Sequence, residues 1–161
     1  MAINPLQEVP VKSFSISAYI CQKDDSGGRF LLIRRTSRYL HGTWQQVSGL
    51  VEPGEKAWEA ALREIEEETS LVPDAFYSAD LIECFYEVEQ NTINLVPVFV
   101  GFVDADARVR LSHEHSDYMW FASTETNDYL HFSSQRESVA HIQRTFLDNE
   151  PSELLRINFS A

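Results

Sequence analysis

The order of apolar and polar residues predicts several strands before any motif is considered. Over positions 14–21 apolar residues alternate with other residues, which is the period of a half-buried strand. A turn at residues 24–28 separates it from a second strand at residues 30–35. Pro97 indicates a bulge or an edge position in a later strand. The later strands are expected at residues 81–88, 95–103, 108–111 and 118–121.

Two segments have the helical period instead. Residues 56–69 contain no Gly or Pro and follow a Pro-Gly loop dipeptide. The apolar stripe of this helix, which is expected to face the core, consists of Trp58, Ala61, Leu62 and Ile65. Ser134 and Glu137 predict a capping box at the start of a last helix. The buried face of that helix would be Val139, Ile142 and Phe146. Strands and helices in this order predict an α/β fold with a mixed sheet between helices.

The first helix also carries an acidic patch. Glu64, Glu67 and Glu68 follow i, i+3, i+4 spacing, so their side chains share one side of the helix. Ala57 and Ala60 lie on that side and are expected to leave room above the carboxylates. Like charges at this spacing repel by about 0.2–0.5 kcal/mol per pair, and a divalent cation would remove the repulsion. The oxygen ligands favour Mg²⁺, with Mn²⁺ as a substitute. The alternative is a solvated acidic helix face.

Residues 49–71, GLVEPGEKAWEAALREIEEETSL, resemble the Nudix box, the signature of the Nudix hydrolases. The one departure is Ser70, where the family usually has glycine. The resemblance implies an α/β/α sandwich in which Glu64, Glu67 and Glu68 bind metal and one carboxylate activates water. It also implies that Arg63 pairs with Glu55 as a structural contact. The residues matching these structural positions are Gly49, which offers its backbone to the metal site, Glu55 and Arg63.

A second stretch, RLSHEHSDYMWF at residues 110–121, places acids and histidines before an aromatic strand. It is similar to a segment of the diadenosine tetraphosphate hydrolases and of the dATP or dihydroneopterin triphosphate pyrophosphohydrolases. That similarity implies that Glu114 is a further metal-site acid. Two alternatives remain at this point, a polar loop and an unrelated zinc site at His113 and His115.

Candidate substrate contacts lie on both sides of the box. Arg34 and Arg35 end a strand and could clamp phosphates, or could form surface ion pairs. Trp44 could stack on a base or a pterin ring, although packing under its loop is favoured. Tyr86, in the strand at residues 81–88, is also assigned to substrate binding.

Composition narrows the class of protein. With 161 residues and 43% apolar residues, the chain is expected to form one domain, residues 1–161. A net charge of −12 makes nucleic-acid binding unlikely, whereas metal ions can bridge an acidic site to an anionic small molecule. The sequence contains no span-length apolar stretch, and its first twelve residues lack a signal peptide, so a cytoplasmic protein is expected. Cys21 and Cys84 are expected to be reduced, buried thiols, and either a monomer or a homodimer is compatible.

Together these features predict a Mg²⁺-dependent hydrolase that cleaves a diphosphate linkage of a nucleotide-type substrate. The passage TWQQVSGLVEPGE favours a (d)NTP or dihydroneopterin triphosphate pyrophosphohydrolase that releases pyrophosphate. The alternatives are a diadenosine tetraphosphate hydrolase and a non-catalytic nucleotide-binding module. An isoprenoid diphosphate isomerase would need a further acid or base near the metal, and Cys84 is a poor candidate because it lies inside a predicted strand.

Overall fold

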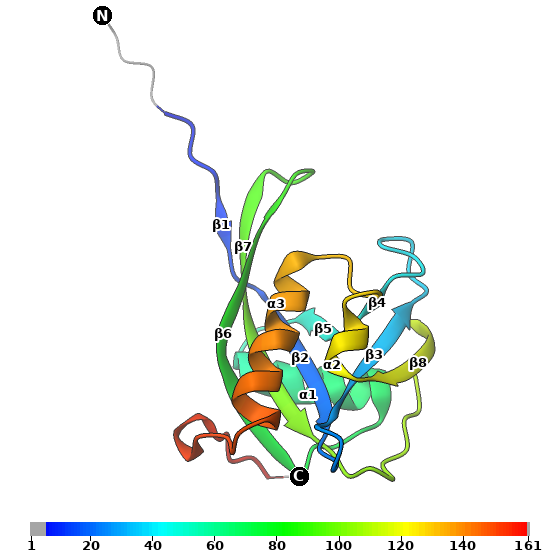
Figure 1. Cartoon of the computed structure of the whole chain (residues 1–161). Helices are drawn as coiled ribbons and strands as arrows, with labels where there is room; N and C mark the ends of the chain where they lie inside the picture. The colour runs from blue at the N-terminus through cyan, green and yellow to red at the C-terminus, as the bar shows by residue number, and fades with distance from the viewer. Residues whose placement is uncertain (1–5, 161) are drawn as a thin grey trace, which may run out of the picture.

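The computed structural model describes residues 6–160, so residues 1–5 and 161, including the start of the segment used for the signal-peptide prediction, lie outside it. An eight-stranded mixed sheet lies between helix α1 on one face and helix α3 on the other (Figure 1). The strands are β1 (Val11–Lys12), β2 (Ser15–Gln22), β3 (Arg29–Arg35), β4 (Trp44–Gln45), β5 (Val47–Leu50), β6 (Ala75–Glu87), β7 (Thr92–Phe102) and β8 (His115–Phe121). The helices are α1 (Ala57–Thr69), α2 (Ser123–Thr126) and α3 (Ser133–Ile142), followed by a π-helical turn η1 (Gln143–Leu147) and a 3-10 turn η2 (Glu153–Leu155). This architecture confirms the predicted fold class.

Strand β2 is at the centre of the sheet, parallel to β7 and antiparallel to β3 and β5. The prediction that it is half-buried is wrong, because helices cover both of its faces. Ile16, Ala18 and Ile20 pack in the core beneath α1, whereas Tyr19 and Cys21 pack in the core beneath α3. β2 therefore separates two hydrophobic cores and fixes where each helix lies.

Local hydrogen bonds define both ends of helix α1. The Glu59 carboxylate accepts from the Lys56 backbone N–H at 2.8 Å, and the helix ends at Ser70 with φ 58°, in the left-handed region. Ala61 and Ile65 are fully buried, as the apolar stripe predicts. Ala60, which is expected to leave room above the carboxylates, is 0% exposed and belongs to the same core.

Beyond α1 the strands are longer than the sequence pattern predicts. β6 and β7 form a hairpin that projects beyond the rest of the sheet (Figure 1). The predicted bulge is present, because the register between β6 and β7 shifts next to the Ile82–Pro97 pair. Cys84 lies on β6 but is exposed, so the buried-thiol prediction holds only for Cys21.

Residues 108–111 do not form a strand, contrary to prediction. They run along the end of α1 instead, where the Arg110 N–H donates to the Thr69 carbonyl at 2.9 Å. The Ser112 N–H likewise donates to the Glu68 carbonyl at 3.1 Å. This segment is therefore tied to the helix that carries the acidic patch.

The last helix begins two residues earlier than predicted, with Phe132 instead of Ser134 at the N-cap, and its capping differs. The predicted Ser134–Glu137 capping box is wrong, because the Gln135 side chain instead accepts from the Phe132 N–H at 3.4 Å. The predicted apolar face is buried at Val139, Ile142 and Phe146. The short helix α2 was not predicted. Within residues 6–160, no helix has the length and apolar character needed to cross a membrane.

Candidate active site

The acidic patch of α1 lies directly against strand β5. Because β5 pairs with the buried strand β2, the backbone at Gly49 is held close to the helix. A Cβ atom at Gly49 would lie 2.1 Å from Cδ of Glu64, which is far inside van der Waals contact. A larger residue would displace the Glu64 side chain, so the structure gives a steric reason for the small residue at the start of the motif.

Arg63 holds the loop and the acidic patch together. Its guanidinium donates to both carboxylate oxygens of Glu55, at 2.8 and 3.0 Å, and the predicted structural contact is therefore present. The same group contacts Glu64 at 2.7 Å, Glu67 at 3.2 Å and the Leu50 carbonyl at 2.9 Å. Hydrogen bonding from Arg63 lowers the pKa of Glu55. One side chain thus connects β5, the loop and α1.

Glu68 is the most unusual of the acidic residues. Its side chain is buried, at 5% exposure, and its Oε2 atom has no hydrogen-bond partner. Burial, and after it the charges of Glu64 and Glu114, raise the pKa of Glu68 to about 8, while Arg35 opposes the rise. Burial also raises the pKa of Glu64. A carboxylate oxygen that is buried without a donor or a cation costs folding free energy.

The loop before β8 brings Glu114 to the same region. The Thr36 N–H donates to the Glu114 carbonyl at 2.9 Å, and the Thr36 hydroxyl donates to the His113 carbonyl at 3.1 Å. His115 starts β8 opposite Arg35 and is buried, with Nδ1 lacking a partner. Burial and the Arg35 charge lower the pKa of His115. The negative charge of Glu114 contributes to the raised pKa values of both Glu64 and Glu68.

The two arginines at the end of β3 point to opposite faces of the sheet, as strand alternation requires. Arg35 shares the face of Leu31 and Ile33, which belong to the core beneath α1, and donates to Gln45 Oε1 at 3.3 Å. Arg34 donates to the Gly42 carbonyl at 3.1 Å and lies 3.7 Å from Asp117. The structure therefore brings Arg35, but not Arg34, to the acidic patch.

The two aromatic candidates do not join this group either. Trp44 packs edge-on against Phe121 and Tyr129, with ring centroids 5.9 and 6.0 Å away, which agrees with the favoured packing role. Tyr86 lies on the exposed β6–β7 hairpin, where its hydroxyl donates to Asn91 at 2.8 Å.

Sequence reasoning missed a buried polar chain beneath α3. Gln135 donates to Gln46 Oε1 at 3.0 Å, and Gln46 in turn donates to the Ser17 hydroxyl. Beside it, Glu83 accepts from Tyr19 at 2.8 Å and from Ser138 at 2.7 Å. The only sequence signal is the polar pair at positions 45–46 before an apolar residue, and it does not reveal the distant partners.

Within residues 6–160, no three carboxylate, imidazole or thiol groups converge closely enough to enclose a cation. Two of the acidic side chains, Glu64 and Glu67, are instead paired with Arg63, which supplies the positive charge that a cation would otherwise provide. The residues nevertheless fit a hard divalent ion, since Glu68 keeps a buried oxygen without a partner and two further carboxylates influence its pKa.

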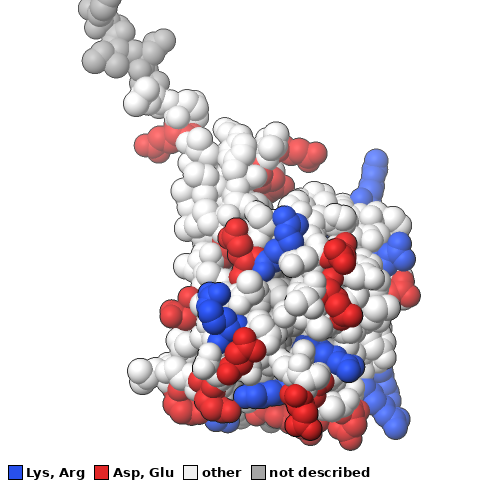
Figure 2. All heavy atoms as spheres, in the orientation of Figure 1, with Lys and Arg blue, Asp and Glu red and all other residues white. Residues whose placement is uncertain are grey.

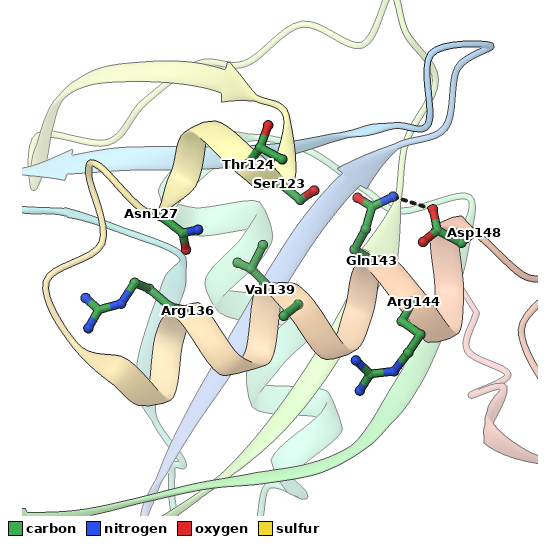
Figure 3. Close-up of a pocket in the computed structure, with 9 residues that line it drawn as sticks. Ser123, Thr124, Asn127, Arg136, Val139, Gln143, Arg144 and Asp148 are labelled. Carbon is green, nitrogen blue, oxygen red and sulfur yellow. Dashed lines mark hydrogen bonds between the residues drawn. The ribbon is translucent and has the colours of Figure 1, made fainter.

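A depression of about 270 Å³ lies elsewhere, between α2 and α3 (Figure 3). Its two arginines, Arg136 and Arg144, hold their guanidinium groups well apart, and Arg136 donates to the Leu130 carbonyl at 2.8 Å. Its one acidic residue, Asp148, accepts from Gln143 at 2.7 Å. This depression has no buried carboxylate, so we place the candidate site at the acidic patch of α1.

Comparison with known proteins identifies the family of the chain. The NUDIX domain model matches residues 13–142. The chain is 29% identical over 119 residues to the nucleoside triphosphatase NudI of Klebsiella pneumoniae, covering 68% of this chain and 84% of that protein. It is also 29% identical over 125 residues to the mouse asymmetrical bis(5'-nucleosyl)-tetraphosphatase, covering 74% and 82%. The solved structure of the MutT protein from Methanosarcina mazei Go1 superposes with a TM-score of 0.68 at 29% identity, covering 86% of this chain and 97% of that one. The domain match spans most of the chain and includes the acidic helix, the glycine beside it and the Arg63 clamp, and the chain therefore belongs to the Nudix hydrolase family.

Proposed function

We propose that this Nudix hydrolase cleaves a nucleoside triphosphate, or a similar triphosphate such as dihydroneopterin triphosphate, and releases pyrophosphate in a Mg²⁺-dependent reaction. The observation that carries the proposal is the buried Glu68 carboxylate, whose Oε2 atom has no partner and whose ionisation is opposed by Glu64 and Glu114. A divalent cation would remove both the unpaired oxygen and the repulsion between the carboxylates, because it supplies the positive charge that they lack.

In this proposal Glu64, Glu67, Glu68 and Glu114 hold the ion. When bound, Mg²⁺ supplies neutralising charge to phosphate oxygens and lowers the pKa of a water molecule. Glu64 and Glu67 must then exchange their contacts with Arg63 for the ion, and Arg63 keeps its two-pronged contact with Glu55. One carboxylate of the set accepts the proton of the attacking water.

Arg35 is the proposed contact for the substrate phosphates. It lies on the sheet face that α1 covers, close enough to lower the pKa of Glu68, and its guanidinium is only partly used by Ser37 and Gln45. A planar cation beside a carboxylate site can bind phosphate oxygens with two parallel hydrogen bonds. The metal and Arg35 together would let a chain of net charge −12 bind a polyanion. Such a substrate is a small cytoplasmic metabolite, and we expect the protein in that compartment.

The alternative substrate is a dinucleoside polyphosphate. Two observations favour this second candidate, the similarity to the mouse tetraphosphatase and the acidic loop that carries Glu114 ahead of β8. The triphosphate remains our first choice because the similarity to the nucleoside triphosphatase is equally strong and the passage before the box favours it. A nucleotide-binding module without catalysis is the further alternative.

The test is product analysis with purified protein in Mg²⁺ and in EDTA. The substrates are dATP, the other nucleoside triphosphates, dihydroneopterin triphosphate and diadenosine tetraphosphate. Pyrophosphate with a monophosphate as the other product would support the proposal. ATP and AMP from the dinucleotide would support the second candidate instead.

The variant that tests the role of this carboxylate is Glu68→Gln, which replaces the ionisable group with a neutral one at nearly constant volume. Loss of a metal-site or proton-accepting group is expected to lower turnover by roughly 10²–10⁴-fold with the fold intact by circular dichroism. A fully active Glu68→Gln protein would refute the role given to this carboxylate. If Mg²⁺ binds and no substrate is hydrolysed, the binding-module alternative is favoured.

A further inference from the structure

Two buried side-chain atoms lack a hydrogen-bond partner within residues 6–160, Oε2 of Glu68 and Nδ1 of His115. Such atoms are rare in folded proteins, because a buried polar atom costs folding free energy unless a ligand, an ion or a water molecule pairs with it. The metal ion of the proposed function would pair with Glu68. It leaves Nδ1 of His115 without a partner, although His115 is only 7% exposed.

His115 is fixed between the acidic helix and the end of β3. The Ser112 N–H donates to the Glu68 carbonyl at 3.1 Å, and the His115 N–H donates to the Ser112 carbonyl at 3.3 Å. Across the sheet, His115 pairs with Arg35. Paired residues of an antiparallel ladder have Cα atoms about 4.5–5.5 Å apart and direct their side chains to the same face. His115 thus lies beside Arg35, on the face of the sheet that α1 covers.

A β-bulge in β8 gives His115 this orientation. Asp117 pairs with Arg34, and the Arg34–Asp117 ion pair at 3.7 Å agrees with this register. The next pair joins His115 to Arg35, so Ser116 is the extra residue of the bulge. Without the bulge, strand alternation would place His115 on the opposite face of the sheet, with Asp117. The bulge therefore brings the imidazole to the side of the acidic patch, and such bulges are common next to active sites.

Arg35 and His115 have N–H groups that the described part of the chain leaves free. The Arg35 guanidinium donates from Nε to Ser37 at 3.0 Å and from Nη1 to Gln45 at 3.3 Å, and no acceptor among residues 6–160 contacts its Nη2. The His115 ring carries an N–H at Nδ1 in one neutral tautomer and in its protonated form. Two neighbouring side chains with free N–H donors, beside carboxylates that fit a divalent ion, are suited to bind a phosphate group.

We propose that His115 binds a phosphate oxygen of the substrate through Nδ1, next to Arg35, and so positions the polyphosphate against the metal-binding carboxylates. This assignment rests on the proposed function, because it requires a polyphosphate substrate, but it applies equally to a triphosphate and to a dinucleoside polyphosphate. On the face that Figure 2 shows, basic and acidic side chains are interspersed over α2 and α3, so that face offers no broad basic patch as another phosphate site. Arg35 and His115 would then hold the phosphate oxygens that the ion does not.

A water molecule with a purely structural role is the alternative partner of Nδ1. The variant His115→Leu separates the two roles, because leucine fills similar space without a polar atom. If Nδ1 serves the substrate, the free protein should keep or raise its melting temperature, since an unpaired buried polar atom has been removed, and ligand affinity should fall. If Nδ1 holds a structural water, the melting temperature should fall and ligand affinity should stay the same.

The test is isothermal titration calorimetry in Mg²⁺ with methylene-bridged analogues of dATP and of diadenosine tetraphosphate, which keep the phosphates but resist cleavage. Because a hydrogen bond to a charged group is lost, His115→Leu should bind these ligands roughly 10–100-fold more weakly. His115→Asn, which keeps a donor near the position of Nδ1, should recover most of that loss. His113→Leu replaces an exposed histidine of the same loop and is the matched control, which should bind like the wild type. Affinity for Mg²⁺ alone should be unchanged in all three variants.

Three results would overturn the proposal, namely unchanged ligand affinity of His115→Leu, an equal loss of affinity for Mg²⁺ alone, or a wild type that binds neither analogue. Product analysis tests the reaction separately. If no triphosphate yields pyrophosphate while ligand affinity still depends on His115, the proposed reaction is wrong and the phosphate contact stands. If pyrophosphate is released and His115→Leu binds like the wild type, the reaction stands and the phosphate contact is wrong.

Discussion

Replacing Glu68 with Gln should stabilise the metal-free protein at alkaline pH, even though the same change is expected to lower turnover strongly. In the folded protein Glu68 is 5% exposed, and burial with the charges of Glu64 and Glu114 raises its pKa from 4.5 to about 8. In the unfolded chain the group ionises at its ordinary pKa. Between these two pH values the folded state binds more protons than the unfolded state, so stability must fall as pH rises through the window.

The size of the change in the free energy of unfolding follows from the rise in the pKa of Glu68. Each pKa unit corresponds to about 1.4 kcal/mol, so a rise from 4.5 to about 8 gives an upper bound of about 5 kcal/mol. Relaxation and water entry reduce such penalties, and we expect about 2–3 kcal/mol. The penalty is absent below the unfolded pKa and complete above the folded one. Gln carries no charge at any pH, so Glu68→Gln should remove this dependence.

The assay is urea unfolding in EDTA at about pH 5 and about pH 9, for the wild type, Glu68→Gln and Glu66→Gln. Glu66 is an exposed glutamate on the same helix and is the matched control. The wild type and the control should lose stability between the two pH values, and Glu68→Gln should lose less. Adding Mg²⁺ at pH 9 should stabilise the wild type more than Glu68→Gln. Parallel pH dependence of all three proteins in EDTA would refute the argument from burial.

Three further substitutions test local geometry. Ser70→Gly should raise the free energy of unfolding by about 1 kcal/mol, because Ser70 has φ 58°, in the left-handed region that glycine adopts freely. A Ser70→Ala protein as stable as Ser70→Gly would contradict this reasoning. Gly49→Ala should lower the free energy of unfolding by about 1–3 kcal/mol and reduce turnover, because its Cβ would lie 2.1 Å from Glu64. An unchanged melting temperature and unchanged kinetics would rule out the steric reason. Arg63→Lys should lower the melting temperature by about 2–4 °C, because one ammonium cannot reproduce the paired contacts with Glu55. Calorimetry that finds no change in the melting temperature would contradict the structural role given to Arg63.

Local patterns in the sequence were sufficient for the elements and for part of the site. The 3.6-residue period determined both the apolar stripe of α1 and the common side of Glu64, Glu67 and Glu68, because helical spacing alone decides which side chains are neighbours. The Glu55–Arg63 contact followed from the motif, and the structure contains it at 2.8 Å. The period of two located β2, since alternation is a property of the strand itself.

Tertiary structure decided which of these residues are buried and which face each other. Half-burial of β2 and a buried Cys84 were wrong predictions, because each depends on an element distant in the sequence that covers or leaves uncovered that position. The separation of Arg35 from Arg34 depends on which sheet face α1 packs against. The perturbed Glu68 likewise arises only where α1 meets β3, β5 and the loop before β8, because a carboxyl pKa responds to burial and to nearby charge, and folding supplies both. The sequence thus determined the donor groups, and the packing of the helix on the sheet decided their electrostatics.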